Sequence, residues 1–147
     1  MNQENKEVCL VPVGGLANRM RAIVSVLNAC QKAGVKLKIV WFRNRDLNAP
    51  FFNPLRSLNV TVKEAARIDF LRYYRPVKKN LWLSKYYLRS HFDKVLSMTD
   101  CIPIVRDEQN LVNLISETER LYMESCYDMG SYRNIREIMS PNRRLSR

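Results

Sequence analysis

The sequence has little that could hold a metal ion or cross a membrane. It has a single histidine and no C-x-x-C pair, so the residue types and spacings of a zinc site are missing. It also has no uninterrupted apolar stretch near the roughly twenty residues that span a bilayer. The first residues, Met1 to Glu7, are too polar for a signal peptide. We therefore expect a protein that is made and kept in the cytoplasm, without a metal or another cofactor.

The four cysteines, Cys9, Cys30, Cys101 and Cys126, lie far apart in the chain. Cys9 falls in an apolar strand and Cys30 on the apolar side of a helix, where a reduced cysteine behaves as a small hydrophobic residue. A catalytic cysteine would need a basic partner, and none can be identified. We therefore predict four buried, reduced thiols, as is usual in the cytoplasm.

Length and composition fit one globular domain. The chain has 147 residues, of which 46% are hydrophobic, and this supplies enough apolar surface for a core. No internal repeat, low-complexity tract or linker divides it. Strands alternate with helices, which favours a parallel sheet with right-handed crossovers. We therefore predict a single Rossmann-like α/β domain over residues 1–147, with helices flanking the sheet.

The predicted elements follow from periodicity and from helix start and stop residues. Strands are predicted at residues 7–13, 36–41, 58–62 and 120–127, and helices at residues 18–32, 80–92, 107–116 and 132–139. The first helix carries one apolar stripe, formed by Met20, Ile23, Val24, Leu27 and Cys30. Its start at Asn18 would let that side chain cap the first turn, and Gly34 ends it. Asp107 can cap a later helix and Pro141 stops the last one. Residues 42–80 are predicted to be irregular.

The most informative segment runs from residue 8 to residue 21 (VCLVPVGGLANRMR). An apolar strand leads into Gly14 and Gly15 and then into an Asn-Arg pair that opens a helix. The glycines let the backbone take positive φ and lie close to a ligand, and the helix start offers unpaired N–H groups with a partial positive charge. Arg19 and Arg21 add formal positive charge. The loop matches neither G-x-G-x-x-G nor G-x-x-x-x-G-K-[ST], so its spacing alone indicates a general anion-binding loop.

The same segment resembles the amino-terminal motif Gly-Gly-Leu-Gly-Asn-Gln-Met of the bacterial α-1,2-fucosyltransferases, and more loosely the loops of protein O-fucosyltransferases and the nodulation fucosyltransferase. The matching positions are Gly14, Gly15, Asn18 and Met20. Ala17 replaces the glycine that follows the leucine, and Arg19 replaces the glutamine. Residues 36–41 and 44–54 resemble the next strand and the aromatic turn after it, and the resemblance fades after about residue 60.

The resemblance implies a two-domain GT-B glycosyltransferase, of which this chain is the amino-terminal, acceptor-side half. The implied partners are a GDP-sugar donor, expected to be GDP-fucose, and a glycan acceptor. The glycine loop would face the nucleotide-sugar, which implies substrate-binding roles for Gly14, Gly15, Asn18, Arg19 and Arg21. The resemblance assigns no catalytic residue.

The donor-binding signature of that superfamily does not occur in this sequence. It takes the form His-x-Arg-x-Gly-Asp or His-x-Arg-Arg-x-Asp, and the only histidine, His91, lacks the arginine two residues later. We therefore expect that the donor domain is absent. The chain alone, whether a short gene product or a fragment, should then transfer no sugar.

Positive charge dominates the composition, with a formal net charge of +11. Lysine and arginine are densest between Arg67 and Arg89, where they alternate with Tyr73, Trp82 and Tyr86. Such a segment can bind nucleic acid, an anionic membrane surface or a sugar acceptor on a lipid carrier. Alternatively, its aromatic side chains pack inward and its cations are only solvated. Peripheral contact with the inner membrane is one expectation, and nucleic acid is not an expected partner. Two alternatives for the whole chain are a basic α/β module that binds nucleic acid and a non-catalytic remnant.

Overall fold

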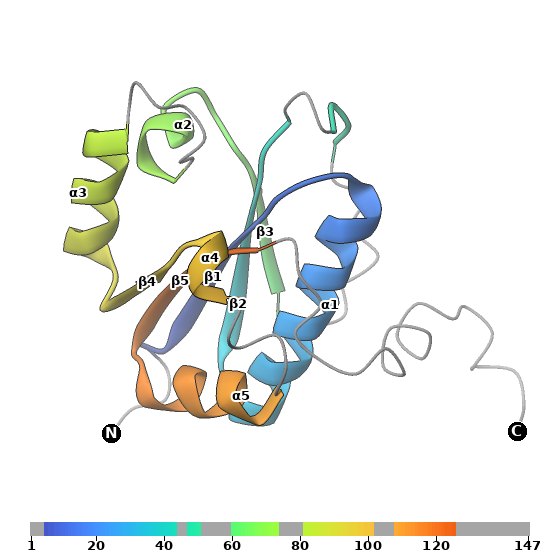
Figure 1. Cartoon of the computed structure of the whole chain (residues 1–147), viewed down its shortest axis with the longest axis vertical. Helices are drawn as coiled ribbons and strands as arrows, with labels where there is room; N and C mark the ends of the chain where they lie inside the picture. Colours follow the sequence, from blue (N-terminus) through green and yellow to red (C-terminus); the bar gives the residue numbers. More distant parts are fainter. Residues whose placement is uncertain (1–4, 44–46, 51–59, 74–80, 102–107, 126–147) are drawn as a thin grey trace, which may run out of the picture.

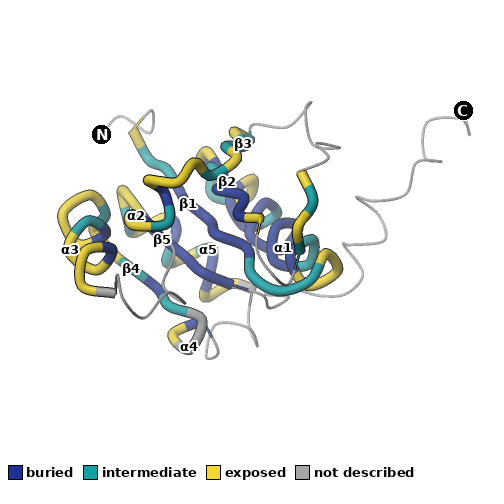
Figure 2. The backbone as a smooth tube through the Cα atoms, turned by 90° about the horizontal axis from the view of Figure 1, so that it is seen from above, coloured by how far each residue is buried: buried dark blue, intermediate teal, exposed yellow. Residues whose placement is uncertain are grey.

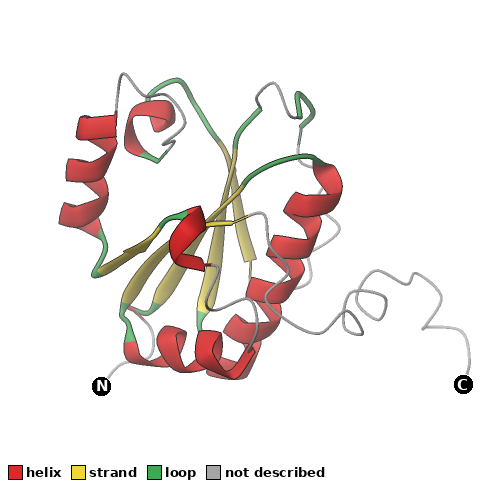
Figure 3. Ribbon diagram, viewed as in Figure 1, coloured by secondary structure: helices red, strands yellow, loops and turns green. Residues whose placement is uncertain are grey.

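Five parallel strands form one sheet in the order β3-β2-β1-β5-β4 (Figure 1, Figure 3). The computed structural model describes residues 5–43, 47–50, 60–73, 81–101 and 108–125. The strands are β1 (Glu7–Pro12), β2 (Lys36–Trp41), β3 (Val60–Glu64), β4 (Lys94–Leu96) and β5 (Arg120–Ser125). The predicted parallel α/β sheet is therefore confirmed.

Helices cover both faces of this sheet. They are α1 (Leu16–Ala33), α2 (Asp69–Arg72), α3 (Leu81–His91), α4 (Met98–Cys101) and α5 (Glu108–Glu117). α1 and α5 pack together on one face, and α2 and α3 lie together over the other (Figure 1, Figure 2). The fold thus has three layers, which is the arrangement expected for a parallel sheet buried on both sides.

The two faces of β1 belong to two apolar clusters. Val8 and Leu10 pack under α1 and α5, whereas Cys9 and Val11 face α2 and α3. β1 is the central strand and is buried from Val8 to Pro12, which is why its sequence reads as a continuous apolar run. The segment after β1 therefore starts in the middle of the carboxyl edge of the sheet.

Most element boundaries agree with the sequence predictions. The strand predicted at 36–41 coincides with β2, and those at 7–13, 58–62 and 120–127 overlap β1, β3 and β5. Residues 58–59 and 126–127 of these predictions lie outside the described residues. The helices predicted at 80–92 and 107–116 correspond to α3 and α5. β4, α2 and α4 were not predicted, because elements of three or four residues are too short to show a period. The helix predicted at 132–139 and the cap at Asp107 lie outside the described residues.

The prediction that α1 begins at Asn18 is wrong. The helix begins at Leu16, and its N-cap is Gly15, with φ −72° and ψ 172° and no side-chain capping bond. Asn18 therefore lies inside the first turn and is not the capping residue. The other end is as predicted, since Gly34 adopts φ 70° and its N–H bonds to the carbonyls of Cys30 and Gln31.

Three of the four cysteines lie in the described part of the chain. Cys9, Cys30 and Cys101 are all buried and outside any disulfide, as predicted, while Cys126 lies outside the described residues. Burial raises the pKa of the Cys9 and Cys30 thiols to about 12. Both thiols are thus neutral at physiological pH, and a neutral thiol is a poor nucleophile.

We expect Cys9, Cys30 and Cys101 to resist maleimide at pH 8 in the folded chain and to react fully in denaturant. Burial excludes the reagent from all three, and the raised pKa keeps the thiolate fraction of Cys9 and Cys30 very small. Peptide mapping by mass spectrometry would report each site separately from Cys126. Rapid labelling of Cys9 or Cys30 under native conditions would contradict their placement in the core.

Candidate functional site

The strand order reverses beside β1. The chain runs from β1 through β2 to β3 on one side, and then places β4 and β5 on the other side. In open parallel sheets, ligands bind outside the carboxyl ends of the strands at such a switch point. The loop of Val13, Gly14 and Gly15 lies there, and the Val13 N–H donates to the Ser125 carbonyl at the end of β5 (3.0 Å).

The two glycines of this loop differ in what they require. Gly14 has a φ of +92°, a conformation that side chains with a Cβ rarely adopt. Gly15 has an ordinary φ of −72°, and a Cβ built on it would meet nothing within 4 Å. The positive φ expected for the loop is therefore found at Gly14, and the space beside Gly15 is open.

The first turn of α1 follows directly and is exposed. Leu16 is 57% exposed, and Ala17 and Asn18 are exposed beside it. The turn contains no acidic residue, and its N-cap residue, Gly15, makes no side-chain capping bond. Because the first N–H groups of a helix have no partner inside the helix, this turn offers donors and a partial positive charge to an anion. Gly14, Gly15 and Asn18 thus lie in one continuous segment at the switch point.

Arg19 takes a different position from its neighbours. Its side chain is fully buried, and its Nε donates to the Gly14 carbonyl (2.6 Å) while Nη1 donates to the Phe42 carbonyl (2.5 Å). The guanidinium also lies 4.7 Å from the centroid of the Trp41 ring. Through these two hydrogen bonds, Arg19 connects the loop after β1 with the end of β2. Direct contact with a ligand, as predicted for it, would require this buried side chain to become exposed. Arg21 is partly exposed farther along α1.

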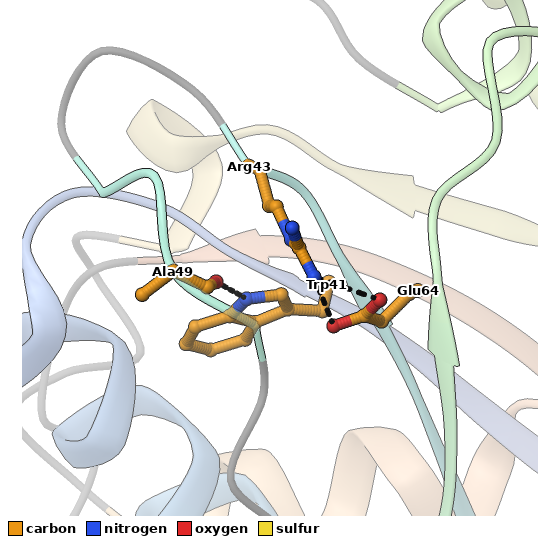
Figure 4. Close-up of polar contacts among 4 residues, drawn as sticks. All are labelled: Trp41, Arg43, Ala49 and Glu64. Carbon is orange, nitrogen blue, oxygen red and sulfur yellow. Dashed lines mark hydrogen bonds and ion pairs between the residues drawn. The ribbon is translucent and has the colours of Figure 1, made fainter.

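Trp41 extends this connection to the segment after β2. Its indole Nε1 donates to the Ala49 carbonyl (2.9 Å; Figure 4), so residues 47–50 are held at the same edge of the sheet. Beside it, Arg43 Nη2 lies 3.3 Å from Glu64 Oε2 at the end of β3 (Figure 4). Both of these charged side chains are about half exposed, and such surface pairs contribute only about 0–1 kcal/mol. Arg19 and Trp41, in contrast, are buried, so water does not screen their contact in the same way.

Glu124 is a candidate that the sequence analysis missed. It lies near the carboxyl end of β5 opposite Val11 and is only 6% exposed. The Tyr122 hydroxyl, which donates to the Tyr73 carbonyl (2.5 Å), lies 3.0 Å from Glu124 Oε1. The available sequence signal was a lone acidic residue directly after the apolar run Leu121 to Met123. It places a buried carboxyl group close to the switch point.

A cavity of about 340 Å³ lies at the opposite, amino edge of the sheet. The first residues of β1, β2 and β5 line it, namely Glu7, Lys36 and Arg120, and so do Asn5, Lys6 and Lys38. The aromatic rings of Tyr73, Tyr87, His91 and Phe92 form the rest of the lining. Four cations here face one carboxylate, so the cavity also favours anions. Its position at the amino ends of the strands makes it separate from the glycine loop.

Among the described residues, no cluster of three or more histidine, cysteine, aspartate or glutamate side chains is arranged to hold a metal ion. None of the described helices combines the length and the apolar character needed to cross a bilayer. In comparisons with protein-family models, curated proteins and solved structures, no match to this chain was found.

Proposed function

We propose that this chain is the amino-terminal domain of a fucosyltransferase-like GT-B glycosyltransferase, and that its β1–α1 loop binds the diphosphate of a GDP-sugar, with GDP-fucose as donor and a glycan as acceptor. The observation that carries this proposal is the exposed first turn of α1, whose N-cap is a glycine without a side-chain capping bond. It follows a positive-φ glycine at the switch point and has no acidic residue. A site built this way suits a multiply charged anion that needs backbone donors.

The loop would act in the reaction by stabilising the leaving group. Sugar transfer displaces GDP at the anomeric carbon, so negative charge grows on the β-phosphate as the bond breaks. Fixed N–H groups aimed at that charge lower the barrier because they need no reorganisation during the reaction. Arg19 would be a positioning residue, because its hydrogen bond to the Gly14 carbonyl fixes the conformation of the loop.

Asn18 and Arg21 would complete this side of the site. Asn18 is exposed in the first turn, where its amide can reach a phosphate or the sugar. Arg21 adds positive charge farther along α1. A second domain would supply the remaining contacts to the nucleotide-sugar, so the chain alone would bind GDP weakly and transfer nothing, since a half-site lacks the preorganised contacts of the complete one.

Replacing Asn18 with aspartate should weaken GDP binding by about ten-fold or more while slightly stabilising the fold. The new carboxylate repels the diphosphate, and the helix dipole favours an acid in the first turn by about 0.3–1 kcal/mol. The measurement is an NMR titration of labelled chain with GDP, in which the amides of residues 14–18 should shift. Urea unfolding of the same variant would report its stability.

Asn110 provides a matched control. It is an exposed asparagine in the first turn of α5, at the same position in its helix as Asn18 in α1. Asn110→Asp makes the same change of charge away from the loop and should leave GDP binding unchanged. Equal losses in the two variants, or a titration that leaves residues 14–18 unmoved, would refute the diphosphate site.

A further inference from the structure

One exposed face of α3 carries two aromatic and two cationic side chains. Trp82 is 76% exposed and Tyr86 is 71% exposed, and Lys85 and Arg89 are exposed between and after them. These positions follow the spacing i, i+3, i+4 and i+7, which places them on one face of a helix. We call this face the outer stripe.

The outer stripe does not hold α3 to the sheet. Ser84 and Leu88 are fully buried on the opposite side of the helix, and Leu88 belongs to the apolar cluster under α2 and α3. The sequence left open whether the aromatic residues of this segment pack inward. Trp82 and Tyr86 instead point away from the core, so the stripe is not explained by packing in the described part of the chain.

Apolar exposure extends from α3 to α2. Of the six large hydrophobic residues exposed among the described residues, five belong to these helices and the turn before α2, namely Ile68 (51%), Leu71 (38%), Trp82, Leu83 (46%) and Tyr86. α2 and α3 pack against each other and lie on the outside of the molecule (Figure 2). We call these five residues the α2–α3 surface. Soluble proteins rarely gather exposed apolar groups in this way unless the surface binds something.

The formal charge around this surface has one sign. Residues 67–73 and 81–91 contain Arg67, Arg72, Lys85 and Arg89, and one acidic residue, Asp69. Asp69 is fully buried, where it accepts bonds from Lys63 Nζ (3.1 Å) and from the Ala66 N–H (2.8 Å). The exposed charge in these two segments is therefore entirely positive.

We propose that the α2–α3 surface docks on an anionic lipid bilayer. Tryptophan and tyrosine favour the headgroup level of a membrane, aliphatic side chains enter the acyl boundary, and lysine and arginine pair with lipid phosphates. Nucleic acid would use the cations and the rings but would leave Ile68, Leu71 and Leu83 in water. A protein partner would use the same aromatic rings and arginines, so a protein interface is an outcome that the test below separates from membrane binding. This surface lies across the sheet from α1, and the inference does not depend on the nucleotide-sugar site.

The test is flotation of the full chain with vesicles of phosphatidylcholine alone or mixed with phosphatidylglycerol. The chain should float only with the anionic vesicles, and added salt should reduce binding because it screens the lipid charge. Trp82 emission should shift to shorter wavelength on binding, whereas Trp41, which is 1% exposed, should not change. The Trp82→Phe variant should lose the shift.

Two double variants separate the contributions of charge and of apolar contact. Lys85→Glu with Arg89→Glu should weaken binding to anionic vesicles by about twenty-five-fold or more, at roughly five-fold for each lost cation. Trp82→Ser with Tyr86→Ser should abolish the binding that persists at high salt. All four side chains are exposed, so the variants should fold, which far-UV circular dichroism would verify.

A charge-matched control uses Lys32→Glu with Lys94→Glu, exposed cations at the end of α1 and in β4. This variant should retain at least half of the flotation seen with the unmodified chain. An equal loss in the control would show attraction by net charge alone and would overturn the inference. Absence of flotation with anionic vesicles would also overturn it. So would a dimer that the Trp82→Ser, Tyr86→Ser variant no longer forms. Binding of a single-stranded oligonucleotide would do the same if it depends on the outer stripe and displaces the vesicles.

Discussion

Arg19→Met should lower the free energy of unfolding by about 2–5 kcal/mol, because it removes two hydrogen bonds that a buried, charged side chain donates to backbone carbonyls. The carbonyls of Gly14 and Phe42 both accept from the Arg19 guanidinium in the native chain. Methionine fills part of the volume beside Trp41 but donates nothing. Urea unfolding would measure the loss through the transition midpoint, and a loss of this size is a large share of the total stability of a small domain.

Two further substitutions test whether the loss comes from the paired hydrogen bonds. Arg19→Lys keeps the charge but lacks the planar fork that reaches two carbonyls at once, so its loss should be smaller than that of Arg19→Met but measurable. Arg21→Met makes the same change two residues later on a partly exposed side chain, and should cost about 1 kcal/mol or less. If Arg19→Met unfolds at the same urea concentration as the unmodified chain, Arg19 does not hold the loop.

Gly14→Ala should lower the free energy of unfolding by about 1–3 kcal/mol, whereas Gly15→Ser should raise it by a few tenths of a kcal/mol. The first change forces a Cβ into a backbone with φ +92°. The second places a good capping residue at the N-cap, where φ is −72° and the added atoms meet open space. Chemical denaturation of both variants under identical conditions is the measurement.

The same pair of variants bears on function. The serine hydroxyl at position 15 would accept a bond from a first-turn N–H and so compete with a phosphate for it. Gly15→Ser should therefore be more stable and yet bind GDP less tightly, a combination that a simple turn glycine would not produce. If Gly15→Ser destabilises the chain as much as Gly14→Ala, the assignment of Gly15 as an open N-cap is wrong.

The position of Arg19 could not have been predicted from its neighbours in the chain. An arginine in the first turn of a surface helix is usually solvated, and by that rule the charge of Arg19 would be available to a ligand. Its partners are the Gly14 carbonyl, the Phe42 carbonyl and the Trp41 ring. Two of these come from the end of β2, and only the parallel pairing of β1 with β2 brings them under the loop.

The face that α3 turns outward was equally undecided in the sequence. Its aromatic residues occur on both sides of the helix, so periodicity allowed either side to face the sheet. The cluster under α2 and α3 takes Leu88 and the partly buried Tyr87, and this leaves Trp82 and Tyr86 on the outside. Glu124 was missed for a related reason, because its placement beside β1 depends on the pairing of β1 with β5.

The sequence by itself determined the parallel α/β sheet, the positions of β1, α1 and β2, the glycine loop between β1 and α1, and the burial of Cys9 and Cys30. These features depend on apolar periodicity and turn chemistry, which act between residues close together in the chain. The tertiary structure decided which glycine takes positive φ, that Arg19 is buried, and that the outer stripe of α3 faces away from the core. Those outcomes depend on strand pairing and on contacts between residues far apart in the chain, and no local pattern specifies them.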